Sequence, residues 1–219
     1  RKSFATTTVE FRMLDSGYGY IQIQEFDYPT YDQFKGAVED LTAQGAKGLV
    51  FDVRNNPGGE LGTICDILDM LVPEGTIIQI VYKDGTMETQ TSDANEINLP
   101  LAVLINGETY SAAELFAATL RDYNKALLVG EKTFGKGCMQ TVFPLGDGTA
   151  VNLTNALYNP PSGNNYHGIG VFPHIEVELP EDLQYKAYYL TYDEDVQLQR
   201  AVAALEAGDK AENYTVRYK

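Results

Sequence analysis

Residues 48–59 read GLVFDVRNNPGG, an apolar run that passes directly into a loop of asparagine, proline and two glycines. A short apolar run bounded by polar residues is typical of a strand that is buried on both faces of a sheet. The loop after it is rich in turn-forming residues and cannot continue as a helix or a strand. Because Gly58 and Gly59 lack side chains, their N–H groups can approach an anion closely. The alternative interpretation of the loop is a tight turn without a binding role.

The patterns on either side of this stretch predict a mixed fold. Alternating apolar residues around Ser16-Gly17 predict a β-hairpin, and Thr30 is expected to cap a helix over residues 31–43. Farther along, the patterns predict strands at 77–82, 87–91, 101–105, 126–129, 138–145 and 149–157, and helices at 61–71, 112–122 and 193–207. Alternating strands and helices favour an α/β core of stacked β-β-α units with a partly parallel sheet.

Length and composition limit the number of domains and the classes of partner. We expect a core over residues 1–190 and a flanking C-terminal appendage of helix and strand over residues 191–219 that packs on it. The net charge of −15 and the lack of a basic cluster argue against nucleic-acid binding. Two cysteines, Cys65 and Cys138, and two distant histidines have no metal-ligand spacing, so neither a metal nor another cofactor is expected. The chain begins at Arg1, and we expect it to be a piece of a longer protein.

A second segment of interest, residues 106–114, contains Ser111 at the predicted start of a helix. Ser111 and Glu114 fit a capping box, so a purely structural cap is one interpretation. A serine at this position is also suited to be a nucleophile, because the N–H of Ala112 and the helix dipole both favour negative charge beside its oxygen. The two interpretations are compatible.

A third segment, residues 130–140, holds Lys136 between two glycines just before a predicted strand. The ordinary expectation is a solvated surface lysine. A lysine keeps its proton at neutral pH unless burial lowers its pKa, and it then becomes a usable base. His167 and His174 offer a rival base for Ser111, but the serine lacks the G-x-S-x-G frame of a nucleophile elbow. We therefore favour Lys136.

Together the three segments resemble the signature of the carboxyl-terminal processing peptidases, also called tail-specific proteases. Residues 48–59 are similar to that family's strand and glycine loop, and residues 106–114 are similar to its nucleophile segment. The spacing from Ser111 to Lys136 and on to Gln140 matches the family, and residues 162–163 and 168–173 fit its closing motif. The resemblance spans roughly residues 8–179.

The resemblance implies a crotonase-like core and a Ser111–Lys136 dyad that cuts protein or peptide substrates near their C-termini. It further implies that Gln140 orients the lysine, that amides of Ala112 and of Gly58 form an oxyanion hole, and that Asp122 and Gly59 are supporting residues. Most members carry a PDZ domain before this core and are exported to the periplasm or cell surface, so an extracytoplasmic location is expected. No PDZ-like stretch is present in these residues. Two alternatives remain: a ligand-binding module on the same core, and an esterase that uses the same serine.

Overall fold

The computed structural model describes residues 6–218. Its strands are β1 (Val9–Met13), β2 (Gly19–Ile23), β3 (Leu49–Asp52), β4 (Gly75–Tyr82), β5 (Met87–Ser92), β6 (Leu101–Ile105), β7 (Ala126–Gly130), β8 (Cys138–Pro144), β9 (Ala150–Asn159) and β10 (Ile175–Glu176). The helices are α1 (Thr30–Ala43), α2 (Leu61–Asp69), α3 (Ala112–Asp122) and α4 (Val196–Glu206), with two short 3-10 helices, η1 (Gln184–Tyr189) and η2 (Ala211–Asn213).

The main sheet has six strands in the order β1-β2-β3-β6-β7-β10. Only the β1–β2 hairpin is antiparallel; β2, β3, β6, β7 and β10 run parallel to one another. The predicted α/β class with a partly parallel sheet is confirmed. Parallel strands end at a common edge, so the loops that follow β3, β6 and β7 meet there, and these are the three segments that the sequence singles out.

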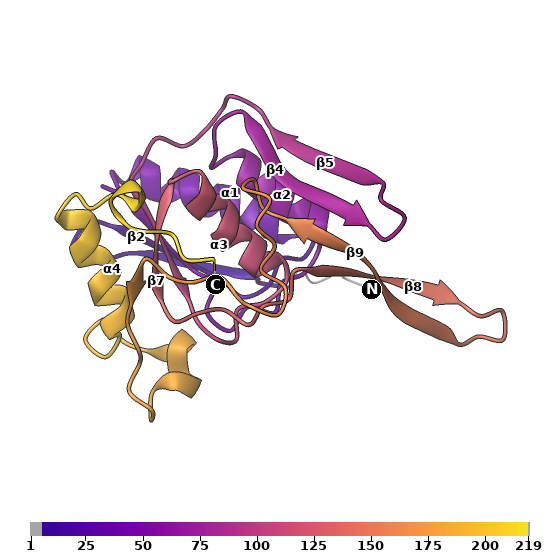
Figure 1. Ribbon diagram of the computed structural model, residues 1–219. Coiled ribbons are helices and arrows are strands. Elements are labelled where there is room, and N and C mark those ends of the chain that lie inside the picture. The colour runs from indigo at the N-terminus through magenta and orange to yellow at the C-terminus, as the bar shows by residue number, and fades with distance from the viewer. Residues whose placement is uncertain (1–5, 219) are drawn as a thin grey trace, which may run out of the picture.

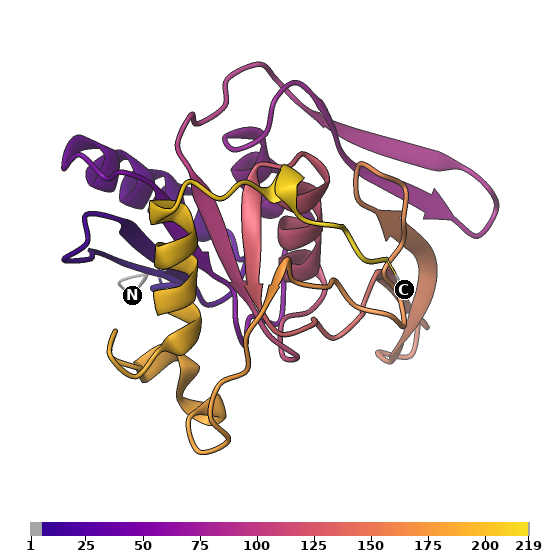
Figure 2. The same ribbon diagram turned by 60° about the vertical axis from the view of Figure 1, so that its left-hand side comes forward.

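Side chains of the central strands alternate between two hydrophobic layers, which is why these strands are apolar throughout. In β3, Leu49 and Phe51 face α1, α2 and α3, while Val50 faces α4. The same alternation holds for Val103 against Leu104 in β6. Figure 2 shows α4 lying across the sheet on the side away from α2 and α3. The sheet is therefore covered on both faces.

A second, antiparallel sheet has the order β5-β4-β9-β8. Its β8–β9 hairpin projects from the body of the molecule in Figure 1, beyond the end of β4. The register of this hairpin shifts between Met139 and Gln140, and a bulge of this kind increases the local twist of the strand. At its base β8 begins beside the start of α3, so the hairpin forms one wall of the pocket described below.

Several details of the expected elements differ in the structure. Helix α2 ends at Asp69 rather than at residue 71, and the described part of the C-terminal appendage, residues 191–218, contains α4 and η2 but no strand. Thr30 is the first residue of α1 rather than its cap, because its hydroxyl donates to the carbonyl oxygen of Glu25 (3.0 Å) instead of capping the helix. The last helix begins at Val196 rather than at residue 193, because Asp195 caps it by accepting from the N–H of Leu198 (2.9 Å). The boundary expected at residue 190 stays a prediction, but α4 does more than flank the core, since it supplies the second hydrophobic layer.

Candidate active site

Ser111 lies immediately before α3 and has an unusual backbone conformation. Its φ is 61° and its ψ is −124°. Positive φ is uncommon for a residue with a side chain, and such strain costs on the order of 1–3 kcal/mol. It persists where surrounding bonds hold it, and the N–H of the preceding Tyr110 donates to the carbonyl oxygen of Asn56 (3.1 Å). The strained residue is thus fastened to the glycine loop that follows β3.

Glu114, one turn into α3, links the serine to the lysine loop. Its side chain is fully buried and accepts four hydrogen bonds. Oε2 accepts from the backbone N–H groups of Ser111 (3.0 Å) and Lys136 (2.6 Å). Oε1 accepts from the hydroxyl of Thr133 (2.5 Å) and the N–H of Gly135 (2.6 Å). Burial raises the pKa of Glu114, and these donors act in the opposite direction.

The glycine loop packs directly against the serine. A Cβ atom on Gly58 would lie 2.7 Å from the Cβ atom of Ser111, and one on Gly59 would lie 2.0 Å from the carbonyl oxygen of Phe26. Both residues also have positive φ, so only glycine fits at either position. The N–H of Gly58 donates to Oδ1 of Asn56 (2.8 Å). It is therefore engaged within its own loop.

A pocket of about 300 Å³ opens beside Ser111. Ser111, at the start of α3, lines it together with Lys136 and Gln140, which lie in the loop before β8 and on β8 itself. Lys136 is half-buried and Gln140 is exposed on β8. Within residues 6–218 no hydrogen bond joins the Lys136 amine to the Ser111 hydroxyl. The remaining lining is mostly apolar: Gly59, Leu61, Ala112, Leu115, Cys138, Met139, Val142, Asn152 and Tyr158.

The other expected site residues lie outside this pocket. Asp122 is at the far end of α3, where Oδ1 accepts from Nη2 of Arg121 (2.8 Å) and Oδ2 from the N–H of Ser162 (3.0 Å). Its supporting role stays a prediction. His174 does not line the pocket, and its Nδ1 accepts a hydrogen bond from the N–H of Leu128 (2.9 Å). Burial lowers the pKa of His174 to about 4. The side chain of His167 is exposed and does not line the pocket.

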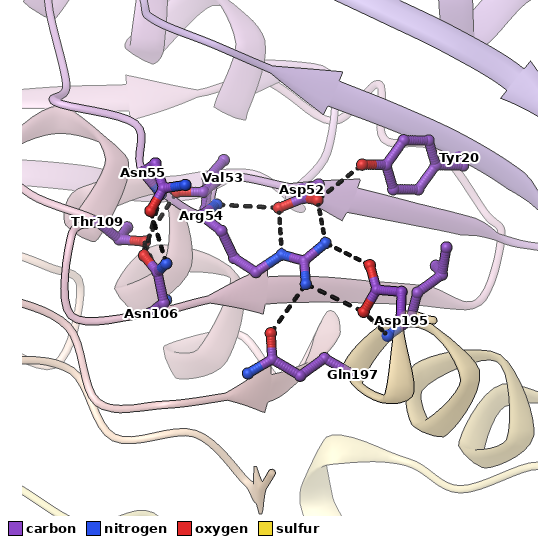
Figure 3. Close-up of polar contacts among 10 residues, drawn as sticks. Tyr20, Asp52, Val53, Arg54, Asn55, Asn106, Thr109, Asp195 and Gln197 are labelled. Atoms are coloured by element: carbon purple, nitrogen blue, oxygen red, sulfur yellow. Dashed lines mark hydrogen bonds and ion pairs between the residues drawn. The ribbon is translucent and has the colours of Figure 1, made fainter. Parts of the chain in front are cut away.

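Arg54 anchors the start of the glycine loop to the rest of the fold (Figure 3). Its guanidinium is fully buried, with Nη2 donating to Oδ2 of Asp52 (2.6 Å) and Oδ2 of Asp195 (2.7 Å). A further bond runs from Nη1 to Oε1 of Gln197 (2.9 Å). Burial acts to lower the pKa of Arg54, but the two carboxylates outweigh this and raise it. The loop is thereby joined to the first turn of α4.

A second polar cluster in Figure 3 fastens the glycine loop to the serine loop. The N–H of Asn55 donates to Oδ1 of Asn106 (3.0 Å), and Nδ2 of Asn106 donates back to Oδ1 of Asn55 (2.8 Å). The hydroxyl of Thr109 donates to the carbonyl oxygen of Val53 (2.8 Å). The two loops therefore form a single rigid platform beneath Ser111.

Comparison with known proteins identifies the family to which this fold and pocket belong. The model of peptidase family S41 matches residues 17–177, well over half of the chain. The chain belongs to peptidase family S41. This confirms the resemblance seen in the three sequence segments.

Relatives of this S41 chain carry names that refer to carboxyl-terminal processing. A carboxyl-terminal-processing protease of Synechocystis is 40% identical over 87% of this chain and 44% of its own length. The carboxy-terminal processing protease CtpA of Bacillus subtilis is 36% identical over 83% of this chain and 39% of its own length. A solved structure of the photosystem II D1 C-terminal processing protease superposes with a TM-score of 0.73 at 34% identity, covering 84% of this chain and 52% of that one. The chain spans about half the length of these relatives, or less.

Several contacts of Ser111 and of the lysine loop in this S41 chain were not expected from the sequence. The hydroxyl of Tyr158 lies 3.3 Å from Oγ of Ser111, and the hydroxyl of Tyr166 lies 3.5 Å from the serine carbonyl oxygen. Both tyrosines lie in the last third of the chain, after the strand predicted at residues 149–157, and no local pattern marks them as site residues. The sequence predicted that Glu114 takes part in a capping box with Ser111, but it did not predict the hydrogen bonds of Glu114 with the lysine loop.

Within residues 6–218 no group of three or more histidine, cysteine or acidic side chains is arranged to hold a metal ion. None of the described helices is long and apolar enough to cross a membrane.

Proposed function

We propose that this chain is the catalytic core of a serine endopeptidase in which Ser111 is the nucleophile and Lys136 its base. We propose further that it cleaves protein or peptide substrates near their C-termini. Membership of family S41 and the names of the relatives support peptidase activity of this kind. The observation that carries the proposal is the pocket that Ser111, at the strained start of α3, shares with Lys136, Gly59 and Ala112.

The reaction begins with attack of Ser111 Oγ on the carbonyl carbon of the substrate peptide bond. As the new bond forms, the serine proton passes to Nζ of Lys136, which must be neutral to accept it. The protonated amine then donates that proton to the leaving nitrogen of the substrate, and water hydrolyses the acyl-enzyme. Gln140 lines the same pocket, and its amide oxygen can accept a hydrogen bond from the lysine without adding a charge.

Backbone N–H groups hold the negative charge that develops on the substrate carbonyl oxygen. Ala112 supplies one of them at the N-terminus of α3, where the helix dipole adds to the stabilisation. The sequence suggested Gly58 for the other, but its N–H already donates to Asn56. We therefore assign the second donor to Gly59, which lines the pocket and is held close to Phe26.

The pocket walls indicate the class of side chain that is accepted beside the cleaved bond. Leu61, Leu115, Met139 and Val142 line the cavity around Ser111. Burying an apolar side chain there is favourable by roughly 25 cal/mol per Å² of area removed from water. We therefore expect cleavage next to small or medium-sized apolar residues. A PDZ domain elsewhere in the full-length protein and an extracytoplasmic location complete the proposal, and both rest on the family resemblance.

The substitution Ser111→Ala tests the nucleophile. The variant should lose cleavage of an unstructured protein substrate while its free energy of unfolding stays within about 1 kcal/mol of wild type, the scale of one hydrogen bond. Retained peptide cleavage in Ser111→Ala would refute the assignment. Turnover of small esters by the wild-type chain without any turnover of peptides would favour the esterase alternative.

A further inference from the structure

The hydroxyl of Tyr158 lies between the two groups of the proposed dyad. Tyr158 is near the end of β9, where it pairs with Ile80 of β4, and its ring belongs to the core on the α3 side of the sheet. Its hydroxyl donates to the carbonyl oxygen of Lys136 (2.6 Å) and lies 3.3 Å from Oγ of Ser111. A single side chain from a third element thus touches both the nucleophile and the backbone that carries the base.

Tyr158 is held rigidly and is suited to remain a neutral donor. It is 7% exposed, and the ring of Tyr166 packs edge-on against it with a centroid separation of 6.1 Å. Burial raises the pKa of Tyr158 well above its ordinary value, so the phenol keeps its proton across the pH range in which a peptidase works. A neutral phenol can donate one hydrogen bond and accept others.

We propose that Tyr158 is a further catalytic residue, whose hydroxyl stabilises the negative charge that develops on Ser111 Oγ as the serine loses its proton to Lys136. In the resting protein the phenolic proton lies toward the Lys136 carbonyl, which is the shorter contact. When charge builds on Oγ, the serine oxygen becomes the stronger acceptor, and its hydrogen bond with the phenol strengthens. An interaction that is stronger in the transition state than in the ground state lowers the barrier of the chemical step.

The proton and electron balance of the acylation step is unchanged by this role. The serine proton goes to Lys136 Nζ, the Oγ lone pair forms the bond to the substrate carbonyl carbon, and the carbonyl π electrons move to the oxygen held by the backbone N–H groups. Tyr158 neither gains nor loses a proton and contributes only a hydrogen bond. The inference rests on the proposed function, because it concerns the same nucleophile.

The test compares Tyr158→Phe with Tyr123→Phe. Tyr123 is a matched control because its hydroxyl also donates to a backbone carbonyl, that of Thr76 (2.9 Å), and it does not line the pocket. For Tyr158→Phe we expect kcat to fall by about 10- to 100-fold with little change in KM, the effect of losing one donor that acts in the transition state. The rate at which a phosphonate probe labels Ser111 should fall in parallel. For Tyr123→Phe both constants should stay near wild type, and rates are expressed per folded molecule.

The outcomes separate this inference from the proposed function. If Ser111→Ala is inactive and Tyr158→Phe keeps the wild-type kcat and labelling rate, Tyr158 has no catalytic role. The catalytic role of Tyr158 is also wrong if Tyr158→Phe raises KM and leaves kcat unchanged. It is equally wrong if Tyr123→Phe lowers kcat as much as Tyr158→Phe does, because a hydroxyl with a purely structural role would have these effects. If Ser111→Ala remains active, the proposed function itself is wrong.

Discussion

At the scale of single residues, Glu114 shows how one buried carboxylate can determine the geometry of a site. It binds the backbone of Ser111 and of Lys136 through the same oxygen, and thereby joins the start of α3 to the loop between β7 and β8. Its negative charge lies inside the protein, where four donors compensate for the loss of water. The lysine's backbone is therefore positioned by the helix that carries the serine.

Glu114→Gln should damage both stability and activity. The amide has one accepting oxygen in place of two, so at least two buried N–H or O–H donors lose their partner, at a cost of about 2–4 kcal/mol in the free energy of unfolding. Turnover should fall by roughly 100-fold, because a small displacement of positioned groups has that effect. Denaturant unfolding and peptide cleavage measure the two quantities.

Glu108→Gln is the matched control for this prediction, since Glu108 is an exposed glutamate in the turn before α3. Within residues 6–218 its side chain accepts one hydrogen bond, from the hydroxyl of Tyr110 (3.2 Å). It should resemble wild type in both measurements. A Glu114→Gln variant that is as stable and active as Glu108→Gln would show that Glu114 does not hold the two loops together.

At the scale of elements, the platform beneath Ser111 depends on contacts that span most of the chain. Arg54 and Asp195 are separated by 141 residues in the sequence, yet they form a buried ion pair that joins the glycine loop to α4. The two carboxylates and Gln197 satisfy the guanidinium from different elements. Removal of the arginine would leave two buried negative charges without a counterion.

Arg54→Met should therefore lower the free energy of unfolding by about 3–5 kcal/mol, the cost of removing one partner from a buried ion pair. Lys210→Met removes a surface pair with Glu212, whose 3.8 Å separation and exposed side chains predict a change of at most about 0.5 kcal/mol. Urea unfolding of both variants gives the comparison. Equal stability of the two variants would contradict the anchoring role of Arg54.

At the scale of the whole molecule, His174 couples the stability of the fold to pH. Burial, and to a smaller degree the charge of Arg121, lower the pKa of His174 to about 4 in the folded chain. In the unfolded chain a histidine titrates near 6.5, so between these values the unfolded state binds more protons than the folded state. The contribution of neutral His174 to the free energy of unfolding is therefore fully present above about pH 6.5 and is lost as the pH falls toward 4.

His174→Asn removes the titration and keeps an acceptor for the N–H of Leu128, because an asparagine Oδ1 occupies a place similar to histidine Nδ1. Between pH 7 and pH 5 the wild-type chain should lose about 1–2 kcal/mol more than the variant in the free energy of unfolding. Chemical denaturation at both pH values provides the measurement. Parallel losses in the two proteins would show that His174 is not the titrating group.

Much of this architecture was predictable because it depends on local sequence patterns. The apolar run before Asn55 and the turn residues after it predicted a buried strand and a loop at its end, and the structure has both. Ser111, Lys136 and Gln140 do line one pocket, although their catalytic roles stay predictions. The contacts of Arg54 with Asp195 and of Tyr158 with Ser111 were not predictable, because they join segments whose proximity depends on the tertiary fold. Gly58 failed for a different, local reason: the turn residues predicted a loop but not its hydrogen bonds, and the N–H suggested as an oxyanion donor donates to Oδ1 of Asn56, two residues earlier.

The central claim is that Lys136 is the base for Ser111, and turnover of a peptide by base variants tests it most directly. Lys136→Ala and Lys136→Arg should both lose at least about 100-fold in kcat, since a methyl group cannot accept a proton and a guanidinium does not release its own. A double variant with His167→Ala and His174→Asn should keep most of its turnover, because neither histidine lines the pocket. If Lys136→Arg instead cleaves the peptide like wild type while the histidine variant is inactive, a histidine is the base and the Ser111–Lys136 dyad is wrong.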